Sequence, residues 1–250
     1  MKRFLCVGDN AMPGNELQEC VNDAKFYKLM AATFGCSADT LLDRFSTKAE
    51  VWDWQMDAQK QAIAGDLTYC GLAISNHGTH QMVNGVLEAA ICCYDMRQEG
   101  DNWWPGGLET ASEFQSWANG FPLACTLEIF LDICYSQGLT KALHPWNSKS
   151  IHNPNNPTGL FRVADNPIHN KLNANIVVWS ASSADEESAD APNLGNGAFT
   201  WGLKKALADD PKASRLEVLI KTKANVKAQG FAQTPHLNAY NVKVQLPIGS

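Results

Sequence analysis

Residues 67–79 read LTYCGLAISNHGT, an apolar run that stops abruptly at small and polar residues. Residues 127–136 read LEIFLDICYS and repeat this pattern, with Cys134 just beyond the apolar run. Such runs are typical of buried parallel strands that end at the edge of a sheet. Ligands and catalytic groups in open α/β sheets lie at the carboxyl ends of the strands. The two stretches therefore predict that His77 and Cys134 lie at one edge of a parallel sheet.

A histidine and a cysteine at one sheet edge suggest nucleophilic catalysis. A cysteine becomes a nucleophile at neutral pH when a neighbouring imidazolium stabilises its thiolate. Taken alone, His77 at a strand end favours a structural role, and Cys134 alone favours a buried core thiol. As a pair at one edge, they indicate a cysteine hydrolase.

The rest of the chain alternates between strand-like and helix-like segments. The expected strands are residues 3–8, 40–42, 67–74, 127–131 and 175–180, with one or two more in 234–245. The expected helices are residues 15–34, 47–64, 110–117, 197–208 and 214–228. We expect mostly irregular structure with a hairpin through 86–95 over residues 80–108, and a long loop over 137–172. This order predicts an α/β fold with a mainly parallel central sheet and helices on both faces. Because no linker divides the chain, we expect one domain over residues 1–250.

Composition excludes several classes of function. The chain has 250 residues with 45% apolar and 18% charged residues, which is typical of an ordinary globular protein. A net charge of −6 without a basic stripe argues against nucleic acid as a partner. No apolar stretch approaches the roughly 20 residues that span a bilayer, so we expect no membrane partner. The short apolar run after Met1-Lys2-Arg3 is too brief for a signal peptide, so we expect a cytoplasmic location.

The eight cysteines predict free thiols, because the chain is large and shows no export signal. No Cys-x-x-Cys occurs, and His77 and His80 are not expected on a helix, so we expect no metal site.

The order of several short motifs resembles that of the caspase-like cysteine peptidases, specifically the metacaspase and prokaryotic caspase branch, over nearly the whole chain. These motifs are CVNDA at 20–24, SNHGT at 75–79, AICCYD at 90–95, DICYS at 132–136, SASSADEESAD at 180–190, GAFT at 197–200 and QTP at 233–235. The family has Ser-Gly-His-Gly at the second motif and Asp-x-Cys-His-Ser at the fourth. Each motif is short, but all of them occur in the order of the family.

The resemblance implies a caspase-like fold and a catalytic dyad of His77 and Cys134. Cys134 would attack the scissile carbonyl, and His77 would act as the general base or as the proton donor to the leaving amine. The backbone N–H groups of Gly78 and Cys134 would bind the oxyanion.

The resemblance also implies an acidic pocket for the residue that precedes the cut. The family positions of this pocket match Cys20, Asp23, Ser75 and Asp132. Two carboxylates favour a long cationic side chain through charge-assisted hydrogen bonds. We therefore expect protein or peptide substrates that are cut after Arg or Lys, and not after Asp.

Some positions depart from the family. Tyr135 replaces the usual His after the cysteine, and Gln137 replaces a Gly, which could reshape the loop around the nucleophile. Many metacaspases bind calcium through a carboxylate seven positions beyond the cysteine, where this chain has Lys141, and through two more near residues 109–111. A hard cation needs several oxygen ligands, so we expect no cofactor and no calcium dependence, although Glu88, Asp95 and Asp101 are nearby acids.

Two other functions remain open at this stage. The first is a catalytically inactive caspase-like scaffold that binds a partner protein, suggested by the changes around Cys134. The second is a thiol hydrolase acting on esters or amides. A separate activator or inhibitor protein would be one means of regulation. Self-processing in the 137–172 loop would be another, with candidate sites at Lys141, Lys149, Arg162 and Lys171.

Overall fold

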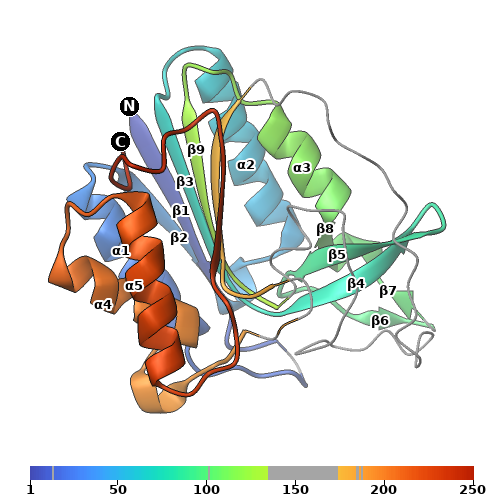
Figure 1. Ribbon diagram of the computed structural model, residues 1–250. Coiled ribbons are helices and arrows are strands. Elements are labelled where there is room, and N and C mark those ends of the chain that lie inside the picture. Colours follow the sequence, from blue (N-terminus) through green and yellow to red (C-terminus); the bar gives the residue numbers. More distant parts are fainter. Residues whose placement is uncertain (13, 101, 135–173, 184–185, 187) are drawn as a thin grey trace.

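One six-stranded sheet with helices on both faces organises the molecule (Figure 1). The computed structural model describes residues 1–12, 14–100, 102–134, 174–183, 186 and 188–250. The strands are β1 (Lys2–Gly8), β2 (Ser37–Leu42), β3 (Tyr69–Ser75), β9 (Thr126–Asp132), β10 (Asn175–Ser180) and β11 (His236–Tyr240), in the order β11-β10-β9-β3-β1-β2. Every pairing is parallel except that of β11 with β10. This confirms the predicted mainly parallel α/β sheet.

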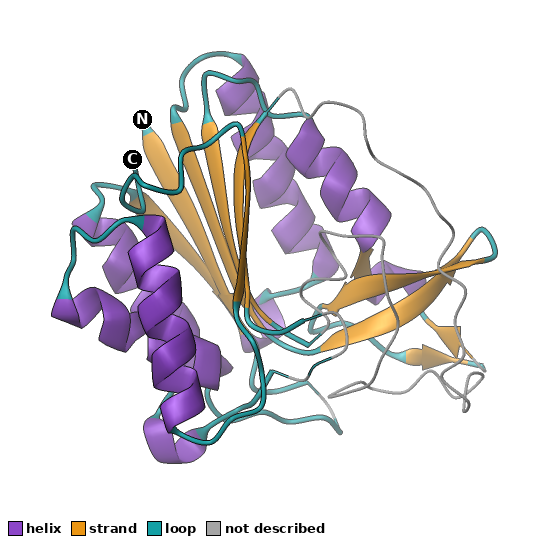
Figure 2. Ribbon diagram, in the orientation of Figure 1, coloured by secondary structure: helices purple, strands orange, loops and turns teal. Residues whose placement is uncertain are grey.

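The helices form two layers, one on each side of the sheet (Figure 2). Helices α1 (Cys20–Thr33), α4 (Ala198–Asp209) and α5 (Arg215–Ala228) cover one face, and α2 (Lys48–Ile63) and α3 (Ala111–Asn119) cover the other. Each layer has its own apolar core, because successive strand side chains point to opposite faces. Phe130 on β9, for example, stacks on Trp179 of β10 with ring centroids 5.7 Å apart.

The helix starts follow local capping rules. Thr110 and Glu113 form the capping box expected at the start of α3. Ser214 and Glu217 form a second capping box on α5, and the side chain of Thr47 accepts from the Glu50 N–H at the start of α2. Three of the five α-helices in the described residues therefore begin where the sequence provides a side-chain cap.

The hairpin expected through residues 86–95 forms earlier in the chain, and less of residues 80–108 is irregular than predicted. Strands β4 (Gly78–Val83) and β5 (Val86–Cys92) form a hairpin, which β8 (Leu108–Thr110) extends to a three-stranded sheet. Short strands β6 (Gln98–Glu99) and β7 (Asn102–Trp103) follow. Asn84 and Gly85 turn the hairpin with φ of 51° and 80°, the left-handed conformations that Asn-Gly adopts in a tight turn. This dipeptide was the overlooked signal.

The helix expected from residue 15 begins at Cys20 instead. The Asn10 side chain donates to the Gln18 carbonyl at 2.7 Å, and the Asp190 carboxylate accepts from the Gln18 and Glu19 N–H groups at 2.8 and 3.2 Å. Asn10 and Asp190 lie outside the helix, so the apolar periodicity of residues 15–34 did not reveal these hydrogen bonds. They hold residues 15–19 as a loop at the carboxyl edge of the sheet.

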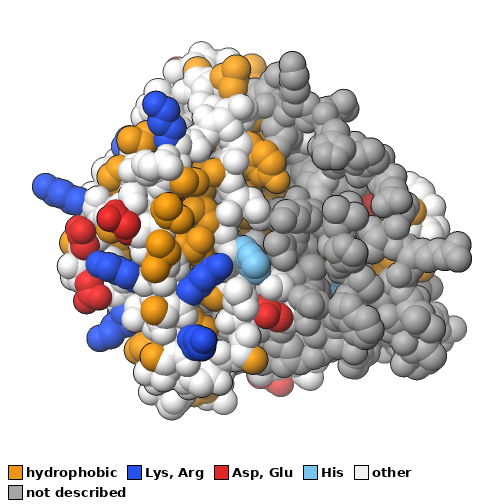
Figure 3. Space-filling model, viewed as in Figure 1, with side chains coloured by type: hydrophobic (Ala, Val, Ile, Leu, Met, Phe, Trp, Pro, Cys, Tyr) orange, Lys and Arg blue, Asp and Glu red, His pale blue; other side chains and the backbone are white. Residues whose placement is uncertain are grey.

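The face shown in Figure 3 carries interspersed Lys, Arg, Asp and Glu side chains among apolar ones. Its described atoms form no continuous basic stripe. The expectation that nucleic acid is not a partner stays a prediction.

A buried ion pair joins the sheet to α5. Arg215 donates to both carboxylate oxygens of Glu128, at 2.9 and 2.8 Å, and both side chains are fully buried. The Tyr69 hydroxyl and the Trp179 indole N–H also donate to this carboxylate, each at 3.0 Å. Such bonding compensates for the removal of two charges from water.

We predict that Arg215→Met lowers the free energy of unfolding by about 3–5 kcal/mol, because it leaves the Glu128 carboxylate buried without its counter-ion. Lys48→Met is the matched control, since Lys48 pairs with Glu113 in a partly exposed ion pair. Its loss should be at most about 1 kcal/mol. Urea unfolding followed by circular dichroism measures both, and equal losses would contradict the assigned role of the buried pair.

Candidate active site

The pairing of β3 with β9 places the two predicted catalytic residues at one edge. Ser75 lies opposite Asp132 in the parallel register, so His77 and Cys134 each follow two residues after this pair. Both residues line one cavity, and so do all four residues expected to form the acidic pocket. The cavity lining comprises Leu17, Cys20, Asp23, Ser75, Asn76, His77, Asp132, Cys134, Ser188, Ala189, Asp190 and Gly197. The sheet edge therefore brings together the residues that the sequence singled out.

Gly78 lies directly against the backbone of Cys134. A Cβ atom at Gly78 would lie 2.2 Å from the Cys134 carbonyl oxygen, so only glycine allows this approach. The two residues expected to supply oxyanion donors are therefore backbone neighbours across the strand ends.

A backbone carbonyl selects the tautomer of the neutral His77 ring. The Nε2 atom lies 2.7 Å from the carbonyl oxygen of Asn15. Because a carbonyl can only accept, Nε2 carries the proton, and Nδ1 is the basic nitrogen of the neutral ring. The Asn76 side chain holds the connection between β3 and β4 in place. Its Oδ1 accepts from the His77 N–H at 2.7 Å, and its Nδ2 donates to the Cys92 carbonyl.

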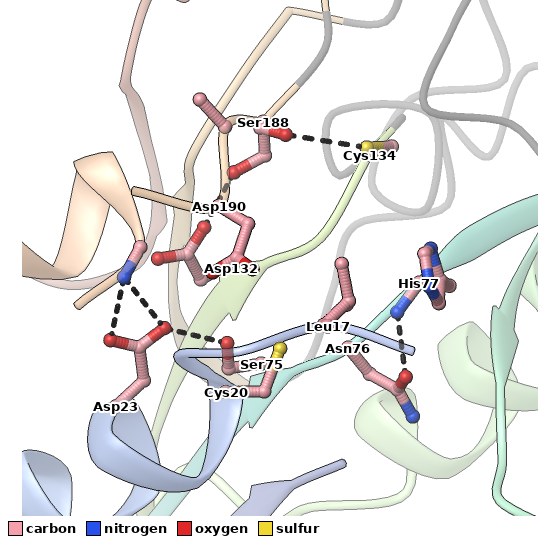
Figure 4. A pocket seen from close by; sticks show the side chains of 12 residues that line it. Leu17, Cys20, Asp23, Ser75, Asn76, His77, Asp132, Cys134, Ser188 and Asp190 are labelled. Atoms are coloured by element: carbon pink, nitrogen blue, oxygen red, sulfur yellow. Dashed lines mark hydrogen bonds between the residues drawn. The ribbon is translucent and has the colours of Figure 1, made fainter. Parts of the chain in front are cut away.

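Cys134 faces the cavity but is covered by a neighbouring loop. Its Sγ donates to the carbonyl of Ser188 at 3.7 Å, and the residue is 4% exposed. Figure 4 shows this contact, with Asp23, Ser75 and Asp132 on one side of the pocket and His77 on the other. The thiol lies at the cavity, and its proton is directed at Ser188.

The start of α4 binds both pocket carboxylates. Asp23 accepts from the Gly197 N–H at 3.0 Å, from the Asn196 side chain at 2.9 Å and from the Ser75 hydroxyl at 2.7 Å. A Cβ atom at Gly197 would lie 2.6 Å from Asp132 and 2.8 Å from Asp23, so a side chain there would collide with both. Donors at the N-terminus of a helix stabilise anions, which explains how two acids share this site.

Asp132 is held by the same helix and by the covering loop. Its Oδ2 accepts from the Thr200 N–H at 3.1 Å and from the Thr200 hydroxyl at 2.6 Å. Its Oδ1 accepts from the Ser188 hydroxyl at 2.5 Å. Ser188 therefore contacts the pocket carboxylate with its side chain and the thiol with its carbonyl.

Burial, and secondly the charge of Asp132, raises the pKa of Asp23 well above its ordinary value. A bound cation would reduce the repulsion between the Asp23 and Asp132 carboxylates. Burial also raises the pKa of the Cys20 thiol, with Asp23 adding to the effect, so Cys20 forms a neutral wall of the pocket.

The cavity encloses about 20 Å³, which is room for about one water molecule. A Lys or Arg side chain needs several times this space. Ser188, Ala189 and Asp190 form one wall of this small cavity.

The residues expected near a calcium site have other roles in the described part of the chain. Glu109 is buried, which raises its pKa to about 8, and it accepts from Gln55. Glu88 and Asp95 accept from the N–H groups of Ser112 and Lys48. Tyr135, Gln137 and Lys141 lie outside the described residues, as do Lys149, Arg162 and Lys171 in the 137–172 loop. The expectation of calcium independence, and the candidate processing sites, stay predictions.

Sequence reasoning missed several residues of the site. The motifs at 180–190 and 197–200 contain Ser188, Asp190, Gly197 and Thr200, but the motifs gave these residues no role. The Asn15 carbonyl belongs to the backbone, so no residue type in the sequence could indicate its contact with His77. The strand ends could be predicted, whereas the loops that complete the cavity could not.

None of the helices in the described part of the chain has both the length and the apolarity needed to cross a bilayer. The eight cysteines are free thiols, as expected.

Comparisons with known proteins identify the fold and the family. A search of curated proteins gave no match. A crystal structure of a protein from Geobacter sulfurreducens aligns with a TM-score of 0.72 at 18% identity, covering 100% of this chain and 98% of that one. Caspase-1 from Spodoptera frugiperda aligns with a TM-score of 0.60 at 12% identity, covering 95% and 87%. At these identities the likeness shows the fold.

The sequence also matches the profile described as Caspase domain over residues 1–246, which is nearly the whole chain. This match supports a function of the cysteine-peptidase kind in general. The chain belongs to the caspase domain family.

Proposed function

We propose that this chain is a cysteine endopeptidase of the metacaspase type that cuts peptide bonds after Arg or Lys. One observation carries the proposal: a single cavity is lined by His77, Cys134 and the two buried carboxylates of Asp23 and Asp132. A nucleophile, a base and a cation-binding group are thus adjacent.

The charge of the cavity favours a cationic side chain. A guanidinium or ammonium group near Asp23 and Asp132 would form charge-assisted hydrogen bonds and relieve the repulsion between the two acids. An acidic side chain would face both carboxylates, and no Arg or Lys is among the residues that line the described cavity. The pocket chemistry therefore supports cleavage after Arg or Lys.

The dyad would act in two stages. Nδ1 of His77 takes the thiol proton while Sγ of Cys134 attacks the scissile carbonyl carbon, and the N–H groups of Gly78 and Cys134 stabilise the oxyanion. The imidazolium then gives its proton to the leaving amine, and a thioester remains on Cys134. Water, deprotonated by His77, attacks this thioester and releases the carboxylate product and the free thiol.

The small volume of the cavity favours one alternative, a caspase-like scaffold that binds a partner without cutting. In the described state the cavity volume of about 20 Å³ admits no substrate side chain. Activity measurements separate the two functions.

We predict that the purified chain releases a fluorophore from peptides ending in Arg or Lys, and that Cys134→Ala removes this activity. His77→Ala should lower kcat by at least about 100-fold, because the general base is lost. A kinetic assay with matched Arg, Lys and Asp peptides, run with and without a calcium chelator, measures both effects.

Cys125→Ala is the control, since this buried thiol lies outside the cavity. Its activity should equal that of the unmodified chain. Cleavage that survives Cys134→Ala would contradict the assignment of the nucleophile, and a folded chain that cuts none of the peptides would favour the scaffold.

We predict that Asp132→Asn lowers kcat/KM for Arg peptides by about 10–100-fold, because a hydrogen bond to a charged group contributes about 1.5–3 kcal/mol. Asp23→Asn should act in the same direction. Asp53→Asn, at an exposed position of α2, removes the same charge far from the site and should change little. Equal effects of all three substitutions would show that net charge, and not the pocket, determines the preference.

A further inference from the structure

Ser188 links the pocket carboxylate to the nucleophile. Its hydroxyl donates to Asp132 at 2.5 Å, and its carbonyl accepts from the Cys134 thiol at 3.7 Å. One residue thus contacts both the group that would bind the substrate cation and the atom that would attack the substrate (Figure 4).

The contact with the carbonyl disfavours ionisation of the thiol. A thiol that donates its proton to a carbonyl is stabilised in its neutral form, whereas the thiolate is the reactive species. Ser188 is also one of the residues that line the cavity of about 20 Å³, so a bound cationic side chain would have to displace part of this wall.

The neighbouring contacts are arranged so that Ser188 can move without disturbing Asp132. The Thr200 N–H and hydroxyl hold Asp132 from the opposite side, and Tyr27 lies 3.1 Å from that hydroxyl. These donors belong to helices α4 and α1, whereas Ser188 lies in a loop. A cation that competes for Oδ1 of Asp132 would therefore displace Ser188 and not the carboxylate.

We propose that Ser188 is a positioning residue through which occupation of the acidic pocket activates Cys134. A cationic side chain takes the place of the Ser188 hydroxyl on Asp132, the loop shifts, and the thiol exchanges the Ser188 carbonyl for His77. The inference rests on the proposed function, because it takes Asp132 as part of the cation-binding pocket. The inference adds that binding of a substrate with a cationic side chain activates Cys134, which then attacks that substrate.

The test measures the rate at which iodoacetamide alkylates Cys134, followed by peptide mass spectrometry on the full chain. The ligand is n-propylguanidine, which carries the cation of an arginine side chain but no scissile bond. n-Propylurea is the uncharged control. Thermal shift reports separately whether either ligand binds.

In the unmodified chain, n-propylguanidine should raise the alkylation rate of Cys134 about tenfold, because the loss of one hydrogen bond to a charged group changes an equilibrium by about this factor. The uncharged n-propylurea should leave the rate unchanged. In Ser188→Ala, which keeps the carbonyl but loses the hydroxyl, alkylation should already be fast without ligand. Ser188→Thr, which keeps a hydroxyl, should restore the response to n-propylguanidine.

Two results would overturn the inference. One is an alkylation rate in ligand-free Ser188→Ala equal to that of the unmodified chain. The other is bound n-propylguanidine, seen by thermal shift, that leaves the rate unchanged. A ligand that does not bind would instead contradict the cationic specificity, and the ligand-free rate of Ser188→Ala would still decide whether Ser188 restrains the thiol.

Discussion

The parallel pairing of β3 with β9 is the constraint on which the site depends. Ser75 and Asp132 are opposite each other in this register, and the chain continues from both to His77 and Cys134. A shift of one residue would turn each strand side chain to the other face of the sheet. Both apolar cores prevent such a shift, because β3 and β9 contribute buried residues to each of them. The packing of the sheet thus fixes the geometry of the candidate dyad.

The second constraint is the stabilisation of two buried carboxylates that lie close together. Asp23 and Asp132 both converge on the first residues of α4, whose free N–H groups compensate for negative charge. These N–H groups stabilise the two carboxylates only in part. The pKa of Asp23 remains raised, because burial and the charge of Asp132 disfavour its ionised form. Under the proposed function, the positive charge of a substrate side chain would supply the missing compensation.

The sequence predicted the parts of the molecule that depend on periodicity. Buried strands appear as apolar runs, and the capping box at Thr110 appears as a spaced pair, so the sheet and most helices were found. The hairpin was predicted through residues 86–95 and lies earlier, over β4 and β5, although Asn84-Gly85 signals its turn. The loop over residues 15–19 was missed because its hydrogen-bond partners lie outside the helix, on nearby Asn10 and on Asp190, which is distant in sequence. Ser188 contacts Asp132 through its hydroxyl and Cys134 through its carbonyl, and only the folded structure reveals both contacts.

The proposed function requires that one cavity joins a cysteine nucleophile, its histidine and a cation-binding pair of carboxylates. A crystal structure of the chain treated with a peptidyl-arginyl chloromethyl ketone would examine all three at once. We expect a covalent bond from Sγ of Cys134 to the inhibitor, with the guanidinium within hydrogen-bond distance of Asp23 or Asp132. An unmodified Cys134, or a guanidinium bound away from both carboxylates, would refute the proposed function.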